Sequence, residues 1–219
     1  MTTIGLIGSG KVGTNIAMAA IAVGYDVVLS NSRGPETLVD LVTRLGPHAK
    51  AATSDEAASL ADFAVAAIPL PGVDHVPVKP LAGKVVLCTI NYFPQWFGNV
   101  ASIDNGTMTA PGVLQEHLPS SYVVRAFNMV DAEEIPTDGR PERDPTRRAL
   151  ALAGDNLEAK KLVAQLYNQF GFDALDIGPL AESWRLDPGQ PAFIVKQNLQ
   201  QLKANVANAR RSNATDPGT

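Results

Sequence analysis

The sequence predicts an α/β protein with a Rossmann-like doubly wound parallel sheet and a small C-terminal appendage. Three observations near the amino terminus predict this fold. An apolar run leads into a glycine-rich turn over residues 8–13, an alanine-rich helical run then ends near Gly24, and a second apolar run follows at residues 27–29. Strand, turn, helix and strand in this order form one βαβ unit, and such units build open parallel sheets.

The length, charge and cysteine content limit the classes of protein that the chain can be. With 219 residues, 45% of them hydrophobic, it can bury one substantial core. A net charge of −4 and a pI near 5.3 leave no basic stripe for nucleic acid. The single cysteine, Cys88, lies in an apolar run and cannot form an intrachain disulfide. With no signal peptide and no apolar run long enough to cross a bilayer, we expect a cytoplasmic protein that binds a small molecule and neither nucleic acid nor a membrane.

The glycine turn has the spacing G-x-G-x-x-G, at Gly8, Gly10 and Gly13. In a dinucleotide site the first glycine permits the tight turn, the second lets the backbone approach the pyrophosphate, and the third lets helix and strand pack closely. The helix that starts near Lys11 would point its positive end at the phosphates. A glycine turn can also have a purely structural role. Here it follows a strand and is followed by a helix and a second strand, and this context indicates a dinucleotide site.

The end of the second strand indicates which dinucleotide is bound. NAD enzymes usually carry Asp or Glu there to bind the ribose 2′-hydroxyl, whereas this chain has Asn31, Ser32 and Arg33. A carboxylate would repel a 2′-phosphate, while an amide, a hydroxyl and a guanidinium would bind one. NADP is therefore favoured over NAD. The alternative is that Arg33 is only a solvated loop charge.

The next segment predicts a second βαβ unit. A helix opened by Pro35 and closed by Gly46 is followed by a brief strand at residues 48–52 and a capped helix that ends at Leu60. Residues 63–68 read as a buried parallel strand that Pro69 terminates. Because ligands sit beyond the carboxyl ends of such strands, we expect Ile68 and Pro69 to lie near the cofactor.

Beyond this strand two features could carry chemistry. His75 stands in a proline-rich stretch, as a proton donor near the nicotinamide or as a solvated loop residue. Residues 84–90 form the next strand, and Asn91 stands at its carboxyl end. Residues 91–112 show no periodicity, and aromatic residues crowd their first part. This stretch is predicted as a long loop that forms a substrate wall or lid, or as a satellite hydrophobic cluster.

In the rest of the chain, the sequence predicts further alternating helices and strands and a final helix. A short helix at residues 113–118 precedes a strand at residues 122–128, and an exposed polar connection covers residues 131–148. A strand at 150–154, a helix from Asp155 to Gly171 and a strand at 172–178 follow, and a last helix is expected over residues 192–209. We therefore divide the chain into an NADP-binding domain (1–148), a smaller C-terminal region packed on it (149–211) and a disordered tail (212–219).

Several segments recur in the same order in the NADP oxidoreductases that depend on coenzyme F420. These segments are residues 7–13, 31–33, 84–86, 124–128, 153–155 and 176–184. The chain resembles this family over nearly its full length, and it is similar to the NADPH-oxidising domain of the STEAP metalloreductases. The most specific part of the resemblance is Ala-Phe-Asn at 126–128 combined with Gly-Pro-Leu-Ala at 178–181.

The resemblance implies hydride transfer between C4 of NADPH and C5 of a deazaflavin, with the two rings stacked in a cleft over the strand ends. It implies that the diphosphate is held by Ser9, Gly10, Lys11 and Val12, and the 2′-phosphate by Asn31, Ser32 and Arg33. The residues that would frame the nicotinamide are Pro69, Asn91, Ala126, Phe127 and Asn128. The family also implies a homodimer.

Hydride transfer between two bound rings requires juxtaposition and exclusion of water more than acid or base chemistry. With three histidines and one cysteine, the sequence offers no metal site and no Ser/His/Asp constellation, which agrees with such a reaction. We expect NADP as cofactor and coenzyme F420 or a related flavin as second substrate. Two alternatives are reduction of a small carbonyl or imine, which needs a proton donor such as His75, Tyr92 or Asn91, and an NADPH-binding sensor without turnover.

Overall fold

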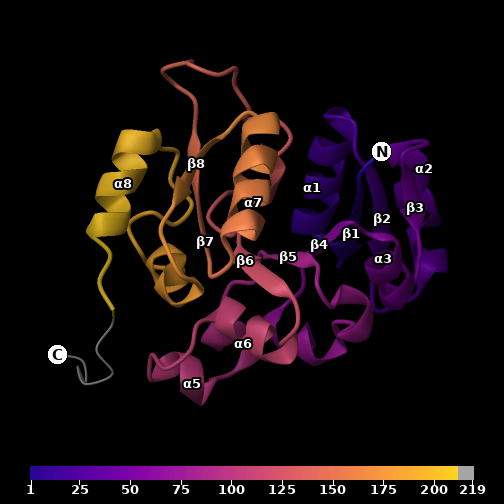
Figure 1. Ribbon diagram of the computed structural model, residues 1–219, viewed down its shortest axis with the longest axis horizontal. Coiled ribbons are helices and arrows are strands. Elements are labelled where there is room, and N and C mark those ends of the chain that lie inside the picture. Colours follow the sequence, from indigo (N-terminus) through magenta and orange to yellow (C-terminus); the bar gives the residue numbers. More distant parts are fainter. Residues whose placement is uncertain (212–219) are drawn as a thin grey trace.

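The computed structural model describes residues 1–211 and contains an eight-stranded sheet in the order β3-β2-β1-β4-β5-β6-β7-β8 (Figure 1). The strands are β1 Thr3–Ile7, β2 Asp26–Ser30, β3 Ala49–Ala51, β4 Phe63–Ala66, β5 Val85–Cys88, β6 Tyr122–Arg125, β7 Ala149–Gly154 and β8 Asp173–Asp176. Every pairing is parallel except the antiparallel pair of β6 and β7. The Rossmann-like fold class is confirmed, with this one reversal in an otherwise parallel sheet.

Helices cover both faces of the sheet. The α-helices are α1 Lys11–Ala22, α2 Val39–Leu45, α3 Ser54–Leu60, α4 Pro94–Phe97, α5 Ala101–Asp104, α6 Ala110–His117, α7 Leu157–Gln169 and α8 Leu199–Ala207. Short 3₁₀ segments are η1 Pro35–Leu38, η2 Leu70–His75, η3 Lys79–Leu81, η4 Ala132–Glu134 and η5 Leu180–Leu186. Buried residues of α1 and α7 join one apolar core, and buried residues of α3 and α6 join the core on the other face. The sheet is therefore doubly wound, as the alternating pattern predicts.

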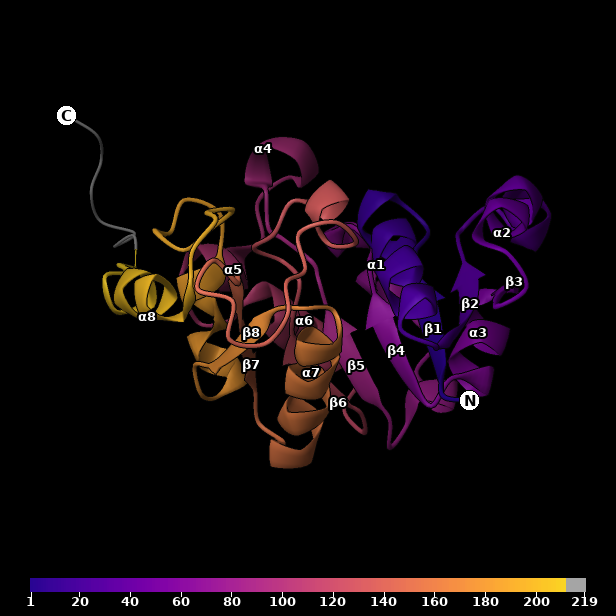
Figure 2. The same cartoon turned by 90° about the horizontal axis from the view of Figure 1, so that it is seen from above.

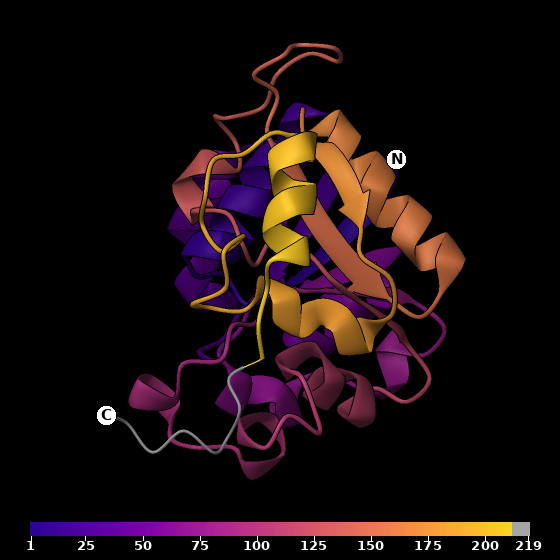
Figure 3. The same cartoon turned by 90° about the vertical axis from the view of Figure 1, so that its left-hand side faces the viewer.

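The C-terminal part continues the same sheet. Along β7, Leu150 and Leu152 pack toward α7, while Ala149 and Ala151 belong to a third apolar cluster with Leu202 of α8. Figure 3 shows α7 and α8 on opposite sides of β7 and β8. This alternation is that of a strand buried on both faces. The boundary predicted between residues 148 and 149 stays a prediction.

The last helix is shorter than the predicted range of 192–209, because residues 192–198 are not helical. Their backbone bonds elsewhere: the Ile194 N–H donates to the Met129 carbonyl at 3.2 Å, and the Gln197 carbonyl accepts from the Ala149 N–H at 2.8 Å. Asn198 then caps α8 with a reciprocal capping box with Gln201. The predicted disordered tail, residues 212–219, lies outside the described residues.

The stretch over residues 91–112 is not a structureless loop, and that prediction is wrong. It contains α4, α5 and the first turn of α6, which starts at Ala110 because the Thr109 side chain accepts from the Gly112 N–H at 3.2 Å. Tyr92 organises the segment: its hydroxyl donates to Asp104 Oδ1 at 2.7 Å and accepts from the Val100 N–H at 2.9 Å.

The aromatic residues of this stretch divide into two groups. Tyr92 packs against the apolar core of its face, which supports the satellite-cluster interpretation. Phe93 and Trp96 stack on each other with ring centroids 4.5 Å apart, and the Trp96 residue remains 68% exposed. Figure 2 shows α4, which carries Trp96, standing out from the body.

The polar connection after β6 is held by a buried arginine. Arg148 Nη1 donates to Glu134 at 2.6 Å and to Asp138 at 3.2 Å, and Lys196 reaches the other Glu134 oxygen at 2.9 Å. The hydrogen bond from Arg148, followed by that from Lys196, lowers the pKa of Glu134 from its ordinary value of 4.5. A lowered pKa means that the stabilisation is fully present above the ordinary value and is lost as the pH falls through the folded-state pKa.

Glu134→Gln is expected to lower the free energy of unfolding by about 1–3 kcal/mol at pH 7, because Arg148 keeps its buried charge and loses a carboxylate. Urea unfolding of wild type and variant at pH 7 and at pH 3 checks this, and the difference should shrink at pH 3. Glu116→Gln, at an exposed residue of α6, is the matched control and should change little. A difference that persists undiminished at pH 3 would contradict the assignment.

Candidate functional site

The glycine turn combines two positions that need glycine for folding with one that leaves space. Gly8 has φ +105°, and a Cβ there would lie 2.3 Å from the Ala67 carbonyl oxygen. A Cβ on Gly13 would lie 2.0 Å from the Gly8 carbonyl oxygen. Gly10 precedes α1, and a Cβ on it would meet nothing within 4 Å. The backbone at Gly10 is therefore open to a ligand in front of the amino end of α1, where no side chain caps the helix.

The end of β2 is shaped by hydrogen bonds of Asn31. Asn31 Oδ1 accepts from the Arg33 N–H at 2.9 Å, and its Nδ2 donates to Thr37 Oγ1 at 2.9 Å. Thr37 in turn donates to the Gly34 carbonyl at 2.7 Å. These bonds hold a tight turn after β2 and leave the Arg33 side chain exposed.

A cavity of about 350 Å³ brings together many of the predicted cofactor residues. Its lining includes Gly8, Gly10, Asn31, Ser32, Ile68 and Pro69. The turn after β1, the end of β2 and the end of β4 therefore meet at one place, as expected for the carboxyl edge of a doubly wound sheet. Lys11 points the other way along this edge, and its Nζ lies 3.3 Å from Glu133 of η4 with both side chains exposed.

His75 is the last residue of η2, which follows β4, and it lines the same cavity as Asn31 and Ser32. Asn91 follows β5, the neighbour of β4 in the sheet, and does not line this cavity. The structure therefore does not bring the two weak catalytic candidates of the sequence together in one cavity.

The edge at β5 and β6 is built on a buried arginine. The Arg125 residue is 0% exposed; it donates to the Ile90 carbonyl, to Asn91 Oδ1 at 2.9 Å and to Asp187 Oδ1 at 2.8 Å. Burial raises the pKa of the Asp187 carboxyl, and the positive charge of Arg125 acts in the opposite direction. The arginine thus fixes the position of Asn91 and holds the segment after η5 against the strand ends.

Asn91 and Asn128 hold each other through their amides. Asn91 Nδ2 donates to the Asn128 carbonyl at 2.9 Å, and Asn128 Nδ2 donates to the Leu186 carbonyl at 2.7 Å and to Asn91 Oδ1 at 3.3 Å. Both side chains are committed to this network. Asn91 is therefore suited to positioning a ligand and not to proton transfer.

The predicted nicotinamide residues after β6 have buried side chains. Ala126 and Phe127 are 0% and 1% exposed, and Phe127 has φ +53°. The Phe127 N–H donates to the Tyr167 hydroxyl at 2.9 Å, and that hydroxyl donates to the Ala151 carbonyl at 3.1 Å. Burial raises the pKa of Tyr167. Since the side chains of Ala126 and Phe127 fill the core, they can shape a ligand site only through the backbone.

Arg125 and Asp187 belong to the site although sequence reasoning did not single them out. The position of Arg125 inside an apolar strand could have indicated its role, because a buried charged side chain requires a partner. The partner could not be identified from the sequence, since Asp187 lies 62 positions away. Within residues 1–211, no group of three or more His, Cys, Asp or Glu is placed to hold a metal ion, and no helix is long and apolar enough to cross a membrane.

Comparison with known proteins adds to this geometry. Residues 3–92, which contain the glycine turn, the end of β2 and Asn91, match the family described as NADP oxidoreductase coenzyme F420-dependent. The match covers the amino-terminal part of the chain, where the predicted diphosphate and 2′-phosphate residues lie. The resemblance drawn from the sequence motifs is confirmed.

Three similar proteins extend the comparison beyond this segment. Metalloreductase STEAP3 of Rattus norvegicus is 28% identical over 182 residues, which are 82% of this chain and 34% of that protein, so the chain spans about one third of its relative. The structure of hypothetical protein SMa0349 from Sinorhizobium meliloti is 29% identical with a TM-score of 0.77, over 90% of this chain and 96% of that one. A candidate F420-dependent NADP reductase from Arthrobacter sp. FB24 has a TM-score of 0.71 at 22% identity, over 84% and 87% of the two chains, and supports the fold alone.

Proposed function

We propose that this protein transfers a hydride between NADP(H) and a flavin-type acceptor, with the deazaflavin coenzyme F420 as the first candidate. The observation that carries the proposal is the cavity at the ends of β1, β2 and β4, where open Gly10 and neutral Asn31 and Ser32 suit a phosphorylated ribose and its diphosphate. The family match over residues 3–92 supports NADP as the dinucleotide.

Each predicted cofactor residue has a role in this proposal. The backbone at residues 9–12 binds the diphosphate at the amino end of α1, and Asn31, Ser32 and Arg33 bind the 2′-phosphate. Ile68 and Pro69 supply apolar surface, and Asn91, fixed by Arg125, and the backbone at residues 126–128 orient the nicotinamide. When bound, NADPH supplies the hydride, and these residues hold its ring beside the acceptor and exclude water.

Reduction of a carbonyl or imine would need a side chain that donates a proton, so the surroundings of the three proton-donor candidates bear on the choice between this reaction and hydride transfer to a flavin-type acceptor. The Tyr92 hydroxyl is engaged by Asp104 and Val100, Asn91 is held by Arg125 and Asn128, and His75 lines the cavity at the ends of β1, β2 and β4, apart from Asn91. This arrangement favours an acceptor that needs no proton from a side chain. Reduction of a small carbonyl or imine is the second candidate, and a sensor without turnover is the third. A homodimer and a cytoplasmic location stay predictions.

Arg33→Ala is expected to weaken NADPH binding by about 10- to 100-fold and to leave NADH binding unchanged, because only NADPH carries the 2′-phosphate that the guanidinium would bind. Titration calorimetry with both dinucleotides measures the difference. Arg44→Ala, an exposed arginine on α2, is the control and should leave both affinities unchanged. Equal losses for NADPH and NADH would contradict the assignment of Arg33.

The function itself is tested by oxidation of NADPH, followed at its absorbance band in parallel reactions with coenzyme F420, FMN, FAD or no acceptor. Turnover with the deazaflavin is the expected result. Turnover with FMN or FAD but not with coenzyme F420 would identify the acceptor as a flavin. Binding of NADPH without turnover with any of them would overturn the proposal and direct the search to carbonyl or imine substrates, or to a sensor.

A further inference from the structure

A second hollow lies at the same sheet edge, beyond Asn91. It is a cavity of about 390 Å³, lined on one side by residues of the 91–112 segment and on the other by the chain from η5 onward. Its lining includes Tyr92, Met108, Trp184, Asp187, Pro188 and Arg211. Tyr92 directly follows Asn91, so this cavity adjoins Asn91, whereas the first cavity lies at β1, β2 and β4. A volume of this size is within the range of small-molecule sites.

Arg125 connects this cavity to the cofactor edge. One of its nitrogens, Nη2, donates to Asn91 Oδ1 at 2.9 Å and to Asp187 Oδ1 at 2.8 Å. Two side-chain oxygens bound to the same nitrogen are close neighbours, and Arg125 itself is fully buried. A ligand that contacts Asp187 therefore lies next to whatever Asn91 positions.

The lining of the cavity mixes polar with apolar groups and includes a carboxylate, Asp187, and a guanidinium, Arg211. Asp187 presents a carboxylate, which accepts hydrogen bonds when ionised. The Arg211 guanidinium lies over the Trp184 ring, 5.0 Å from its centroid, and donates to the Gly106 carbonyl at 2.9 Å. Arg185 also packs on the Trp184 ring, at 4.5 Å. The charged and titratable groups that line the cavity are Tyr92, Asp104, Asp187 and Arg211, and Asp104 is already bonded by Tyr92 and Asn99.

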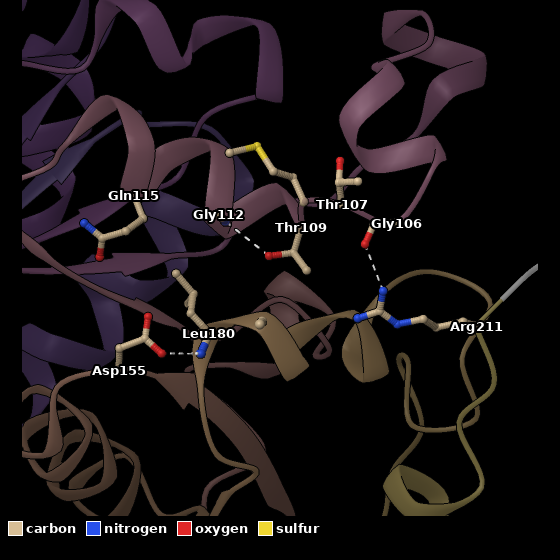
Figure 4. A pocket seen from close by; sticks show the side chains of 10 residues that line it. Gly106, Thr107, Thr109, Gly112, Gln115, Asp155, Leu180 and Arg211 are labelled. Atoms are coloured by element: carbon tan, nitrogen blue, oxygen red, sulfur yellow. Dashed lines mark hydrogen bonds between the residues drawn. The ribbon is translucent and has the colours of Figure 1, made fainter.

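The hollow continues beyond Arg211, which lines both parts. A neighbouring cavity of about 220 Å³ extends between α6 and the start of η5. It shares four lining residues with the 390 Å³ cavity, namely Gly106, Met108, Thr109 and Arg211. Figure 4 shows Arg211 reaching across to Gly106, with Thr109 and Asp155 further along. We call the two cavities together the acceptor groove. The 220 Å³ cavity has room for a substituent of a ring that is bound in the 390 Å³ cavity.

We propose that the acceptor groove binds the hydride acceptor, a planar heteroaromatic ring with an N–H donor and a carbonyl on one edge. Asp187 accepts from the ring N–H, Arg211 donates to the ring carbonyl, and Tyr92 and Trp184 flank the ring. The pyrimidinedione edge of flavins and deazaflavins has this chemistry. This inference rests on the proposed function, and it adds the residues that select the acceptor.

The step is balanced without a further reactant. The C4–H bond of the nicotinamide breaks, and its hydrogen and electron pair form a C–H bond at C5 of a deazaflavin or an N–H bond at N5 of a flavin. A further ring nitrogen takes one proton from solvent. NADPH is oxidised and the ring is reduced. Asp187, Arg211 and Arg125 bind and orient, and none of them changes its covalent bonds.

Trp184 gives a direct readout of occupancy, because the chain contains only two tryptophans. In a Trp96→Phe background the remaining indole lies in the groove wall. Titration with coenzyme F420, and separately with FMN, should quench its fluorescence. Asn105→Phe, which fills the groove from an exposed lining residue, should weaken this binding about tenfold or more and leave the NADPH affinity unchanged. Lys203→Phe, on the exposed face of α8, is the matched control.

A second variant tests the polar recognition. Asp187→Asn should also weaken F420 or FMN binding about tenfold, while Asp74→Asn, an exposed aspartate outside the groove, should not. Absence of quenching by both probes, or unchanged binding in Asn105→Phe and Asp187→Asn, overturns the inference. Turnover with F420 that survives both variants leaves the proposed function standing and overturns only the groove. Binding that both variants abolish, without NADPH oxidation by the wild type, supports the groove and refutes the proposed reaction.

Discussion

Gly10→Ala is expected to weaken NADPH binding by about 10- to 100-fold while the free energy of unfolding changes by no more than about 1 kcal/mol. In the protein alone, a Cβ at this position meets nothing within 4 Å, and the backbone at φ −72° accepts alanine. The space that the methyl group would fill is the approach to the amino end of α1. The loss therefore falls on the ligand and not on the fold.

The neighbouring glycine provides the contrast. Gly8→Ala should lower the free energy of unfolding by about 2–4 kcal/mol, since its φ of +105° disfavours a side chain and its Cβ would lie 2.3 Å from the Ala67 carbonyl oxygen. Urea unfolding and NADPH titration of both variants measure the two effects separately. If Gly10→Ala binds NADPH as tightly as the wild type, the turn does not hold the diphosphate.

Arg125→Met is expected to lower the free energy of unfolding by about 3–5 kcal/mol. The substitution fills a similar volume but leaves Asp187 without its cation and the Ile90 carbonyl without the Arg125 donor. Asn91 Oδ1 keeps only the 3.3 Å bond from Asn128. Polar groups buried without a partner lose their hydration and gain nothing in return. Urea denaturation curves of wild type and variant give the difference.

Arg185→Met is the matched control for Arg125→Met. Arg185 pairs with Glu182 at 2.7 Å, but its side chain is 29% exposed, and such a pair contributes about 1 kcal/mol or less. A double variant, Arg125→Met with Asp187→Leu, should recover part of the loss, because it removes both buried charges together. If Arg125→Met costs no more than Arg185→Met, the buried pair does not hold the strand ends in the way described.

Local patterns made most of the fold predictable. The glycine turn, the third strand and the capped helix after it, α3, depend on residues within a few positions of one another. The structure confirms β3 at Ala49–Ala51 and the cap of α3, which Thr53 forms through a capping box with Glu56. The same holds for the end of β2, where Asn31 bonds to Arg33 and Thr37. In these segments, propensity and tertiary structure favour the same conformation.

The errors arose where distant contacts decide the conformation. Residues 192–198 carry no helix breaker after Pro191, yet their backbone bonds to Met129 and Ala149 instead of to itself. The segment 91–112 shows no helical periodicity, because its short helices are held by Tyr92 and by caps and not by an apolar stripe. The groove was missed for the same reason, since its walls come from segments about 80 positions apart in the sequence.

The sequence separation of Arg125 and Asp187 has a consequence for the order in which the ligand-binding edge assembles. The edge at β1, β2 and β4 uses residues 7–76 alone, whereas Asn91 is fixed only after Asp187 closes a contact across 62 positions. Contacts of long sequence separation require closure of a long loop and form late. During folding, the part of the site that binds the nucleotide's phosphates should therefore form before the part around Asn91 that orients the reacting ring. Pulsed hydrogen exchange during refolding would detect this order as early protection at Gly8, whose N–H donates to the Ser30 carbonyl, and late protection at Ile194, whose N–H donates to the Met129 carbonyl.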